Sequence, residues 1–448
     1  MRTRFLWPAA AILAVAGCQS YQAKPLEPEQ ILAEAEQTRS SVPEGELVDL
    51  SKAAELMLQH SPRLREARAA QATFQAVADT PTPLPNPNIF LMPTFLDLTE
   101  ISSSQRWGVE VPIGWSIPIN GRLRINDELN ALLAEQAQVD LISSQREEYL
   151  GLRGEFAGLA MASRARAATD DLNQTVETSV ALMRRMVEAA QASALDVYEL
   201  EVERSRVDAT VELAEEAEQA ARGALALRTG IWSEAFRVEE LPHIPDEVPT
   251  FEQLRDLMLR DHPGLARLRA DYSVAEKQLR LEVANQYPDL ELGGLFEREG
   301  NVNRFGLGIG IELPIFDRNQ QAIAAARANR EQVRIAFEAE VARGLARIEV
   351  VRNRLLLRRQ RFEELRTLAE PATRKTIELG RRALAAGAID SMRYFALLRV
   401  NREVALELLD AQNSLYEAWS LLEDTCGAPL LHFPTDPVLV APAEETES

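Results

Sequence analysis

The chain carries one sequence pattern twice, about 200 residues apart, and this duplication limits the fold more than any other feature. Residues 56–64 (LMLQHSPRL) return as residues 257–265 (LMLRDHPGL) at an offset of 201. Further along, residues 193–196 (SALD) match residues 387–390 (GAID) at an offset of 194. Because the register drifts by only a few residues, we expect two structurally equivalent halves.

The N-terminus carries the pattern of an export signal. Arg2 and Arg4 precede an apolar run over residues 5–16, which is too short to span a bilayer. Small residues then lead into Cys18, the arrangement at which bacterial lipoproteins are cleaved and acylated. Ordinary cleavage after Ala16 is the alternative.

Gln19 follows the cysteine, whereas lipoproteins kept at the inner membrane usually carry Asp there, so the expected location is the outer membrane, with the lipid on its periplasmic side. The predicted parts are a signal peptide over 1–17, a lipid-anchored extended segment over 18–46, a first repeat over 47–241, a linker over 242–250, a second repeat over 251–427 and a tail over 428–448. The tail is polar and is expected to be partly disordered.

Composition argues against a nucleic-acid partner, a disulfide bond and a membrane-spanning helix. A net charge of −20 and a pI near 4.9 argue against a nucleic-acid partner, which would need a basic face. Cys426 is the only cysteine besides Cys18, so no disulfide is expected within the mature chain. No later run of eighteen apolar residues is present, so any membrane crossing is expected to use strands.

Each half reads as a short helix, a second helix, two strands, a long helix and a return helix. The first half is predicted to have helices over 50–59 and 62–80, strands over 89–98 and 107–119, a long helix over 121–190 and a return helix over 196–229. The second half is predicted to have helices over 251–260 and 263–284, strands over 290–297 and 304–316, a long helix over 318–385 and a return helix over 390–425. The long helices would extend ~105 Å, far beyond ordinary globular helices.

The strands alternate apolar residues with small or polar ones. The apolar positions are Val109, Val111, Ile113 and Trp115 in the first half and Phe305, Leu307, Ile309 and Ile311 in the second. No second sheet is available to cover such a face, so the pattern predicts a membrane barrel with these residues outward. Trp107 and Trp115 could lie at the membrane interface, and burial within the protein is the alternative for both. Four strands are too few to close a barrel, so the chain is expected to share one with other copies of itself.

The helices have the spacing of coiled coils. One seam of alternating four- and three-residue steps is Val404, Leu408, Ala411, Leu415, Ala418 and Leu422. Elsewhere small residues and alternating charges predominate, which favours a hollow helical wall with water on both faces. A solid periplasmic bundle is the alternative.

Short motifs in a fixed order resemble the TolC family of outer-membrane factors. They are SPRL at 61–64, HPGL at 262–265, YPDL at 287–290, ELPIFD at 312–317 and AGAID at 386–390. The resemblance covers nearly the whole mature chain and is closest to the lipidated efflux-channel branch.

The resemblance implies an α+β, mainly α fold: a homotrimer whose outer-membrane β-barrel continues into a periplasmic α-helical barrel. Such proteins are passive exit ducts that dock to a periplasmic membrane-fusion adaptor and an inner-membrane pump, here expected to be of the resistance-nodulation-division type. The rival interpretation is a lipid-anchored periplasmic coiled-coil adaptor or scaffold, which would have a single hairpin among several β-rich domains.

No enzyme chemistry is indicated. The four histidines, His60, His243, His262 and His432, are scattered, and none has a partner at i+3 or i+4. Neither a Gly-rich phosphate loop nor a Gly-x-Ser-x-Gly motif is present. We therefore predict no catalytic, cofactor or metal site and no cofactor.

The helix tips are the expected gate. In the family, an acidic ring follows the second hairpin turn, but the matching positions here hold Arg393 and Ala396. The first hairpin offers Glu199 at the equivalent position, after Asp196, so a ring of Glu199 facing Arg393 is one hypothesis. The alternative is that Asp196 and Asp390 are helix N-caps with solvated neighbours.

Replacing Cys18 with Ser should abolish acylation but leave membrane insertion intact, because strands and not the lipid make the membrane contact. Labelling with a radioactive fatty acid measures the first effect and membrane fractionation the second. Label that persists on Cys18→Ser would refute the anchor assignment.

Overall fold

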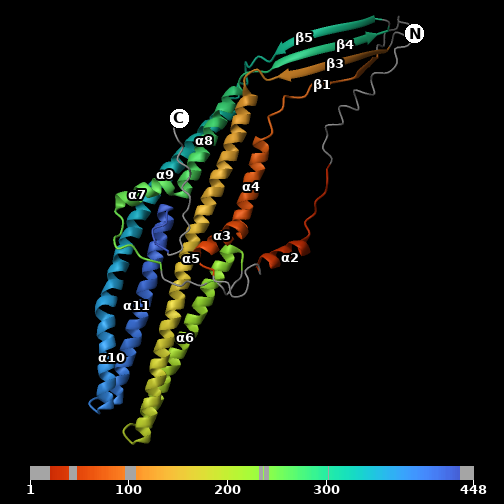
Figure 1. The fold of residues 1–448 in the computed structure, drawn as a ribbon. Helices are drawn as coiled ribbons and strands as arrows, with labels where there is room; N and C mark the ends of the chain where they lie inside the picture. Colours follow the sequence, from red (N-terminus) through yellow and green to blue (C-terminus); the bar gives the residue numbers. More distant parts are fainter. Residues whose placement is uncertain are drawn as a thin grey trace.

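The structure, a computed structural model, describes residues 21–39, 48–95, 107–231, 236, 242–300 and 302–433. Cys18, the connection between the two predicted strands of the first half and the tail beyond residue 433 lie outside these residues. The molecule is long and narrow, with a β-sheet at one end and the tips of two helical hairpins at the other (Figure 1).

The two halves have the same order of elements. After α2 (Pro28–Arg39), the first half contains α3 (Leu50–His60), α4 (Pro62–Ala78), β1 (Asn88–Ile89), β2 (Met92–Phe95), β3 (Trp107–Ile117), α5 (Arg122–Glu188) and α6 (Ala194–Thr229). The second contains α7 (Phe251–Asp261), α8 (Pro263–Ala284), β4 (Leu290–Glu299), β5 (Val302–Ile311), α9 (Gln320–Glu364), the π-helical turn η2 (Leu365–Ala369), α10 (Glu370–Ala385) and α11 (Ser391–Cys426). The mainly helical fold class is confirmed. Among the described helices, none is both long and apolar enough to cross a membrane.

The strands form a single antiparallel sheet in the order β1-β3-β4-β5, with β2 also paired to β3. The predicted first strand, 89–98, is divided into β1 and β2, which keep one register against β3. The division falls opposite Pro112: Phe90 N–H donates to the Pro112 carbonyl at 3.0 Å, but proline has no N–H to return the bond. The part of the predicted strand beyond Phe95 lies outside the described residues.

The long helices of the two halves differ in one respect. α5 is continuous over 67 residues, about 100 Å. The helix predicted over 318–385 is instead interrupted by η2, immediately before Pro371. A proline ring clashes with the carbonyl four residues earlier in an α-helix, and a wider π-turn relieves that clash. The prediction of one unbroken helix was wrong at this point.

The helices lie side by side in a row. Toward the sheet, neighbours in contact follow the order α4, α5, α8, α9; toward the tips the order is α6, α5, α11 and then α9 with α10 (Figure 1). The row therefore has one edge made by α4 and α6 and another made by α9 and α10.

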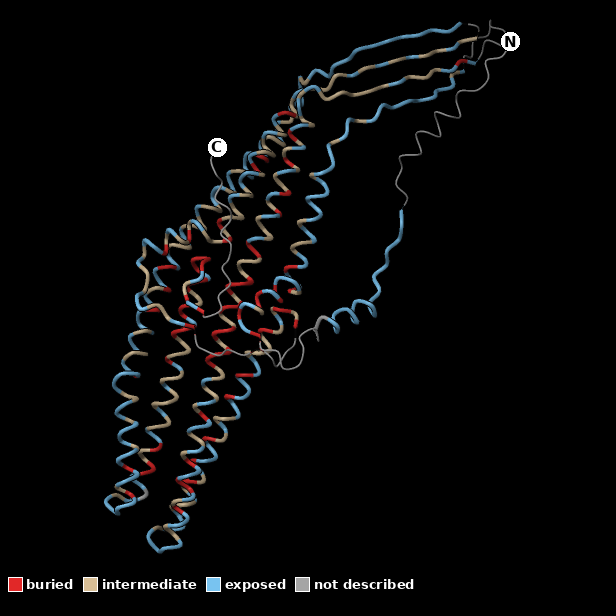
Figure 2. The backbone as a smooth tube through the Cα atoms, viewed as in Figure 1, coloured by how far each residue is buried: buried red, intermediate tan, exposed pale blue. Residues whose placement is uncertain are grey.

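Buried residues gather at mid-height and again near the tips (Figure 2). The mid-height core joins α3, α5, α6, α7, α9 and α11, and it contains Phe156, Leu225, Ile348 and the fully buried Trp419. Both halves thus contribute to one core, and the helices extend from it in both directions.

One ion pair lies inside this core. Arg153 of α5 and Glu423 of α11 are 0% and 1% exposed, and their charged groups are 2.9 Å apart. Glu423 also accepts hydrogen bonds from the backbone N–H groups of Leu430 and Leu431, at 2.6 and 2.7 Å. Arg153 in turn donates to the Leu431 carbonyl and lies over the ring of Phe433, 4.8 Å from its centroid. The pair fixes the chain after α11 against the first repeat.

Arg153→Met should destabilise the protein by about 3–5 kcal/mol, because it leaves the Glu423 carboxylate buried without its counter-charge. Adding Glu423→Gln should restore much of the loss, since the charge that lacks a partner is then gone. Denaturant unfolding of the single and double variants measures both effects. Wild-type stability in the single variant would mean that water reaches this core.

Candidate functional site

The sheet has one apolar face. Residues opposite each other on neighbouring strands share a face, and Trp115, Leu292 and Ile309 form one such row. The same register places all eight apolar residues predicted from sequence on this face: Val109, Val111, Ile113, Trp115, Phe305, Leu307, Ile309 and Ile311. The opposite face carries glycine and charged residues, including Glu110, Gly114, Glu291, Glu297, Arg304 and Gly308.

This apolar face is uncovered in a single chain. Phe305 and Leu307 are 80% and 98% exposed, which is far more than a soluble core strand allows. Trp115 is half-buried, and its indole N–H donates to the Pro85 carbonyl at 2.9 Å. The face is therefore suited to contact with lipid or with another chain.

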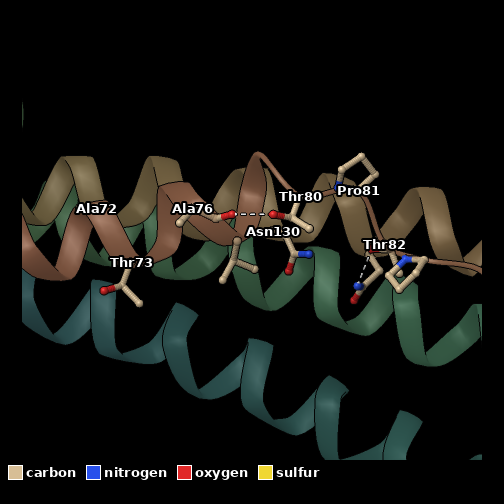
Figure 3. Close-up of a pocket in the computed structure, with 10 residues that line it drawn as sticks. Ala72, Thr73, Ala76, Thr80, Pro81, Thr82 and Asn130 are labelled. Carbon is tan, nitrogen blue, oxygen red and sulfur yellow. Dashed lines mark hydrogen bonds between the residues drawn. The ribbon is translucent and has the colours of Figure 1, made fainter. Parts of the chain in front are cut away.

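An open pocket of about 790 Å³ lies where α4 ends and the chain turns toward the sheet (Figure 3). Most of the side chains that line it are small: they are alanines, threonines and prolines from α4 and the segment after it. Thr82 N–H donates to Asp127 Oδ1 at 2.7 Å, and Asn126 Nδ2 donates to Thr82 Oγ1 at 3.0 Å. These bonds fasten the proline-rich segment to α5, and the pocket holds no nucleophile paired with a base.

The tip of the first hairpin ends α5 and begins α6. Ala190 turns the chain with φ at 57°, and Ser193 is the N-cap of α6. Asp196 lies three residues later, and its carboxylate accepts the Ser193 N–H at 2.9 Å. The prediction of Asp196 as the N-cap was wrong: a serine three residues earlier takes that position, and Asp196 completes a capping box.

The tip of the second hairpin follows a different turn. Gly387 adopts φ 71°, a conformation that favours glycine, and Asp390 is the N-cap of α11, as predicted. Asp390 Oδ1 accepts the backbone N–H of Arg393 at 2.8 Å. The Arg393 side chain is exposed.

An apolar cluster holds the two tips together. It draws Val180 and Met183 from α5, Leu200 from α6, Leu384 from α10 and Phe395 from α11. Beside it, a crevice of about 250 Å³ lies between α6 and α11 and is lined by Glu199, Leu200, Val202, Glu203, Arg206, Met392, Phe395, Leu398 and Arg399. The structure thus places Glu199 at the junction of the two hairpins, while a pairing with Arg393 stays a prediction.

The ion pair observed between the hairpins uses other residues. Arg402 Nε of α11 lies 3.0 Å from Glu203 Oε1 of α6, and both side chains are largely buried. Sequence reasoning missed this pair because it depends on how two hairpins from different repeats approach each other. Glu203 lies one helical turn beyond Glu199, on the same face of α6.

The two edges of the row carry exposed apolar stripes. On α6, the exposed residues Leu195, Tyr198, Val202, Leu213 and Leu227 fall within an arc of about 60°. On α9, Ile335, Val350 and Leu357 fall within a similar arc, and they are followed by Leu368 and Leu379. Single-chain packing leaves these side chains in water.

The edges also differ in charge. α6 carries nine carboxylates and four arginines, and α4 carries one carboxylate and three arginines, so their edge has a net charge of −3. The run from α9 to α10 carries eight carboxylates and fifteen basic residues, a net charge of +7. Opposite charges favour contact between the two unlike edges of successive copies.

Enzyme-like groups are not assembled in the described part of the chain. No cluster of three or more His, Cys, Asp and Glu side chains is found there. Cys426 is fully buried, and burial raises the pKa of its thiol to about 12, so it stays protonated and unreactive. Burial lowers the pKa of His262, which lies at the start of α8 as its N-cap residue.

Comparison with known proteins agrees with this architecture. The family described as outer membrane efflux protein matches residues 254–428. The cobalt-zinc-cadmium resistance protein CzcC of Cupriavidus metallidurans is 27% identical over 342 residues, which cover 75% of this chain and 76% of CzcC. The solved outer-membrane channel OprN is similar in fold, with a TM-score of 0.70 and 17% identity over 85% of this chain and 90% of OprN.

The outer membrane protein VceC of Vibrio cholerae is also similar in fold, with a TM-score of 0.68 and 16% identity over 85% of this chain and 96% of VceC. The second half of the chain thus matches the outer membrane efflux protein family, and the chain has the fold of these two solved outer-membrane proteins.

The two faces of β5 should respond differently to charge. If the apolar face lies in a membrane, Ile309→Arg on that face should weaken membrane insertion by ~2–4 kcal/mol, because the guanidinium would enter hydrocarbon. Gly308→Arg is the matched control: it is adjacent, lies on the opposite face and has open space around the added side chain. Folding into lipid vesicles measures both, and equal losses would mean that the apolar face does not meet lipid.

Proposed function

We propose that this chain, as a homotrimer, forms the exit duct of a tripartite efflux system in the outer membrane. Three sheets would close one twelve-stranded barrel, and three rows of helices would form the tube beneath it. A periplasmic adaptor would dock at the helix tips and connect the duct to an inner-membrane pump, for which we propose the resistance-nodulation-division type. The duct itself conducts passively.

The observation that carries the proposal is that both edges of the chain are open and unlike. Within the described residues, β5 pairs only with β4, and β1 and β2 pair only with β3, so both sheet edges have unpaired backbone groups. The helical edges are apolar, and their charges are opposite in sign. Unlike edges join head to tail, and such contacts form a closed ring when the rotation between successive copies adds up to a full turn.

The lipid on Cys18 remains part of the proposal. It would add a second attachment beside the barrel, whose strands supply the main membrane contact.

The tips are proposed as the gate. The Glu203–Arg402 pair would hold the two hairpins of one chain together, and Glu199 and Arg393 would pair between hairpins of neighbouring chains. An exposed pair is worth at most ~1 kcal/mol, but three copies in a ring act together. Opening would then require these contacts and the apolar tip cluster to separate.

Purified protein in planar bilayers tests both the duct and the gate. The wild type should form channels of low conductance, Arg393→Glu should raise conductance, and adding Glu199→Arg should restore part of the closure. Arg374→Glu is the control, because Arg374 is exposed on α10 and pairs with Glu370 on the same helix. Absence of channels in every variant would refute the duct, whereas unchanged conductance in Arg393→Glu would refute only this gate.

A further inference from the structure

Two of the four histidines meet although they are far apart in sequence. His243 of the inter-repeat segment and His432 beyond α11 form an isolated antiparallel bridge. The His243 N–H donates to the His432 carbonyl at 2.7 Å, and the His432 N–H donates to the His243 carbonyl at 3.1 Å. Residues that exchange both bonds have side chains on the same side, and these ring centroids are 6.4 Å apart.

We propose that His243 and His432 form a two-histidine site for a divalent transition-metal ion of the Cu²⁺ and Zn²⁺ class. Imidazole nitrogen is a preferred ligand of these ions. If a metal lies ~2.1 Å from one nitrogen of each ring, the two ring centroids can be up to about 6.4 Å apart when the N–metal–N angle is close to straight. A tetrahedral N–metal–N angle requires the centroids to be about 5 Å apart. Both residues are exposed, so rotation of the rings can supply that approach.

The hydrogen bonding of His432 prepares it as a ligand. Its Nδ1 lies 3.1 Å from the Leu430 carbonyl oxygen, which can only accept. Nδ1 is therefore the donor, and in the neutral ring Nε2 keeps the lone pair that a metal binds. Donation of the second ring N–H to a backbone carbonyl is the usual support of a metal-binding histidine.

Both backbone segments are fixed before any metal binds. The Tyr416 hydroxyl donates to the Pro242 carbonyl at 2.9 Å, and Arg352 Nε donates to the Pro249 carbonyl at 2.9 Å. On the other side, Glu423 accepts the Leu431 N–H at 2.7 Å. Metal binding would therefore lose little conformational entropy, because only the two histidine side chains have to become ordered.

Water would complete the coordination, since the described residues contain no cluster of three or more His, Cys, Asp and Glu side chains. Affinity should be higher for Cu²⁺ than for either Zn²⁺ or Co²⁺, the order usual for nitrogen ligands. The negative net charge of −20 also concentrates cations near the protein. A bound ion would cross-link the segment between the repeats to the end of the second repeat.

Titration of tag-free mature protein in detergent with Cu²⁺ and with Zn²⁺ tests the site. We expect one equivalent of Cu²⁺ per chain, an electron paramagnetic resonance spectrum with imidazole nitrogen coupling, and a metal-dependent rise in Tm. His243→Gln and His432→Gln should each weaken Cu²⁺ binding by more than about tenfold. About tenfold is the smallest loss usual when only a contact that supports a metal ligand is removed.

His60→Gln is the control, because His60 ends α3 and takes no part in the bridge. It should bind Cu²⁺ as the wild type does. Metal-free Tm values equal to the wild type would show that the variants fold. Unchanged Cu²⁺ binding in His243→Gln and His432→Gln, or an equal loss in His60→Gln, would overturn the proposal, and neither result bears on conductance.

Discussion

Open edges are the constraint on which the rest of this structure depends. Every unpaired backbone group placed in hydrocarbon costs several kcal/mol, so a sheet whose outer strands lack partners cannot enter a membrane alone. The helical row has the same problem in milder form, because Leu213 and Leu227 on one edge and Leu357 on the other leave apolar surface in water. Copies joined edge to edge resolve both problems at once.

Most of the buried residues of a single chain lie away from these edges. Stability is concentrated at mid-height, where Trp419 and Phe156 are buried and Arg153 pairs with Glu423 across the two repeats. From that core the helices extend with little burial, as Figure 2 shows. A second, smaller cluster around Met183 and Phe395 joins the tips.

Local patterns predicted much of this fold. Alternation in the strands correctly assigned Ile113 and Ile309 to one face, because strand periodicity leaves no choice once the strand is recognised. The duplication predicted the order of elements in the second half from that in the first. The Asp390 cap followed from its position before a helical run.

Some errors depend on another part of the chain, and others are local. Pro112 interrupts the strand that pairs with its own, whereas Pro371 accompanies a π-turn within its own helix. Ser193 caps α6 because the turn between α5 and α6 lies two residues earlier than predicted. The Glu203–Arg402 pair needs two hairpins brought together, and no spacing rule within one helix can predict it.

Native mass spectrometry of the detergent-solubilised protein tests the central claim most directly, because it counts the chains in the assembly. We predict three copies per particle. A charge reversal on the α6 edge should lower that number unless it is matched by a reversal on α9. A stable monomer or dimer of the wild type would contradict edge-to-edge closure, since the apolar stripes and the unpaired strands would then have no partner.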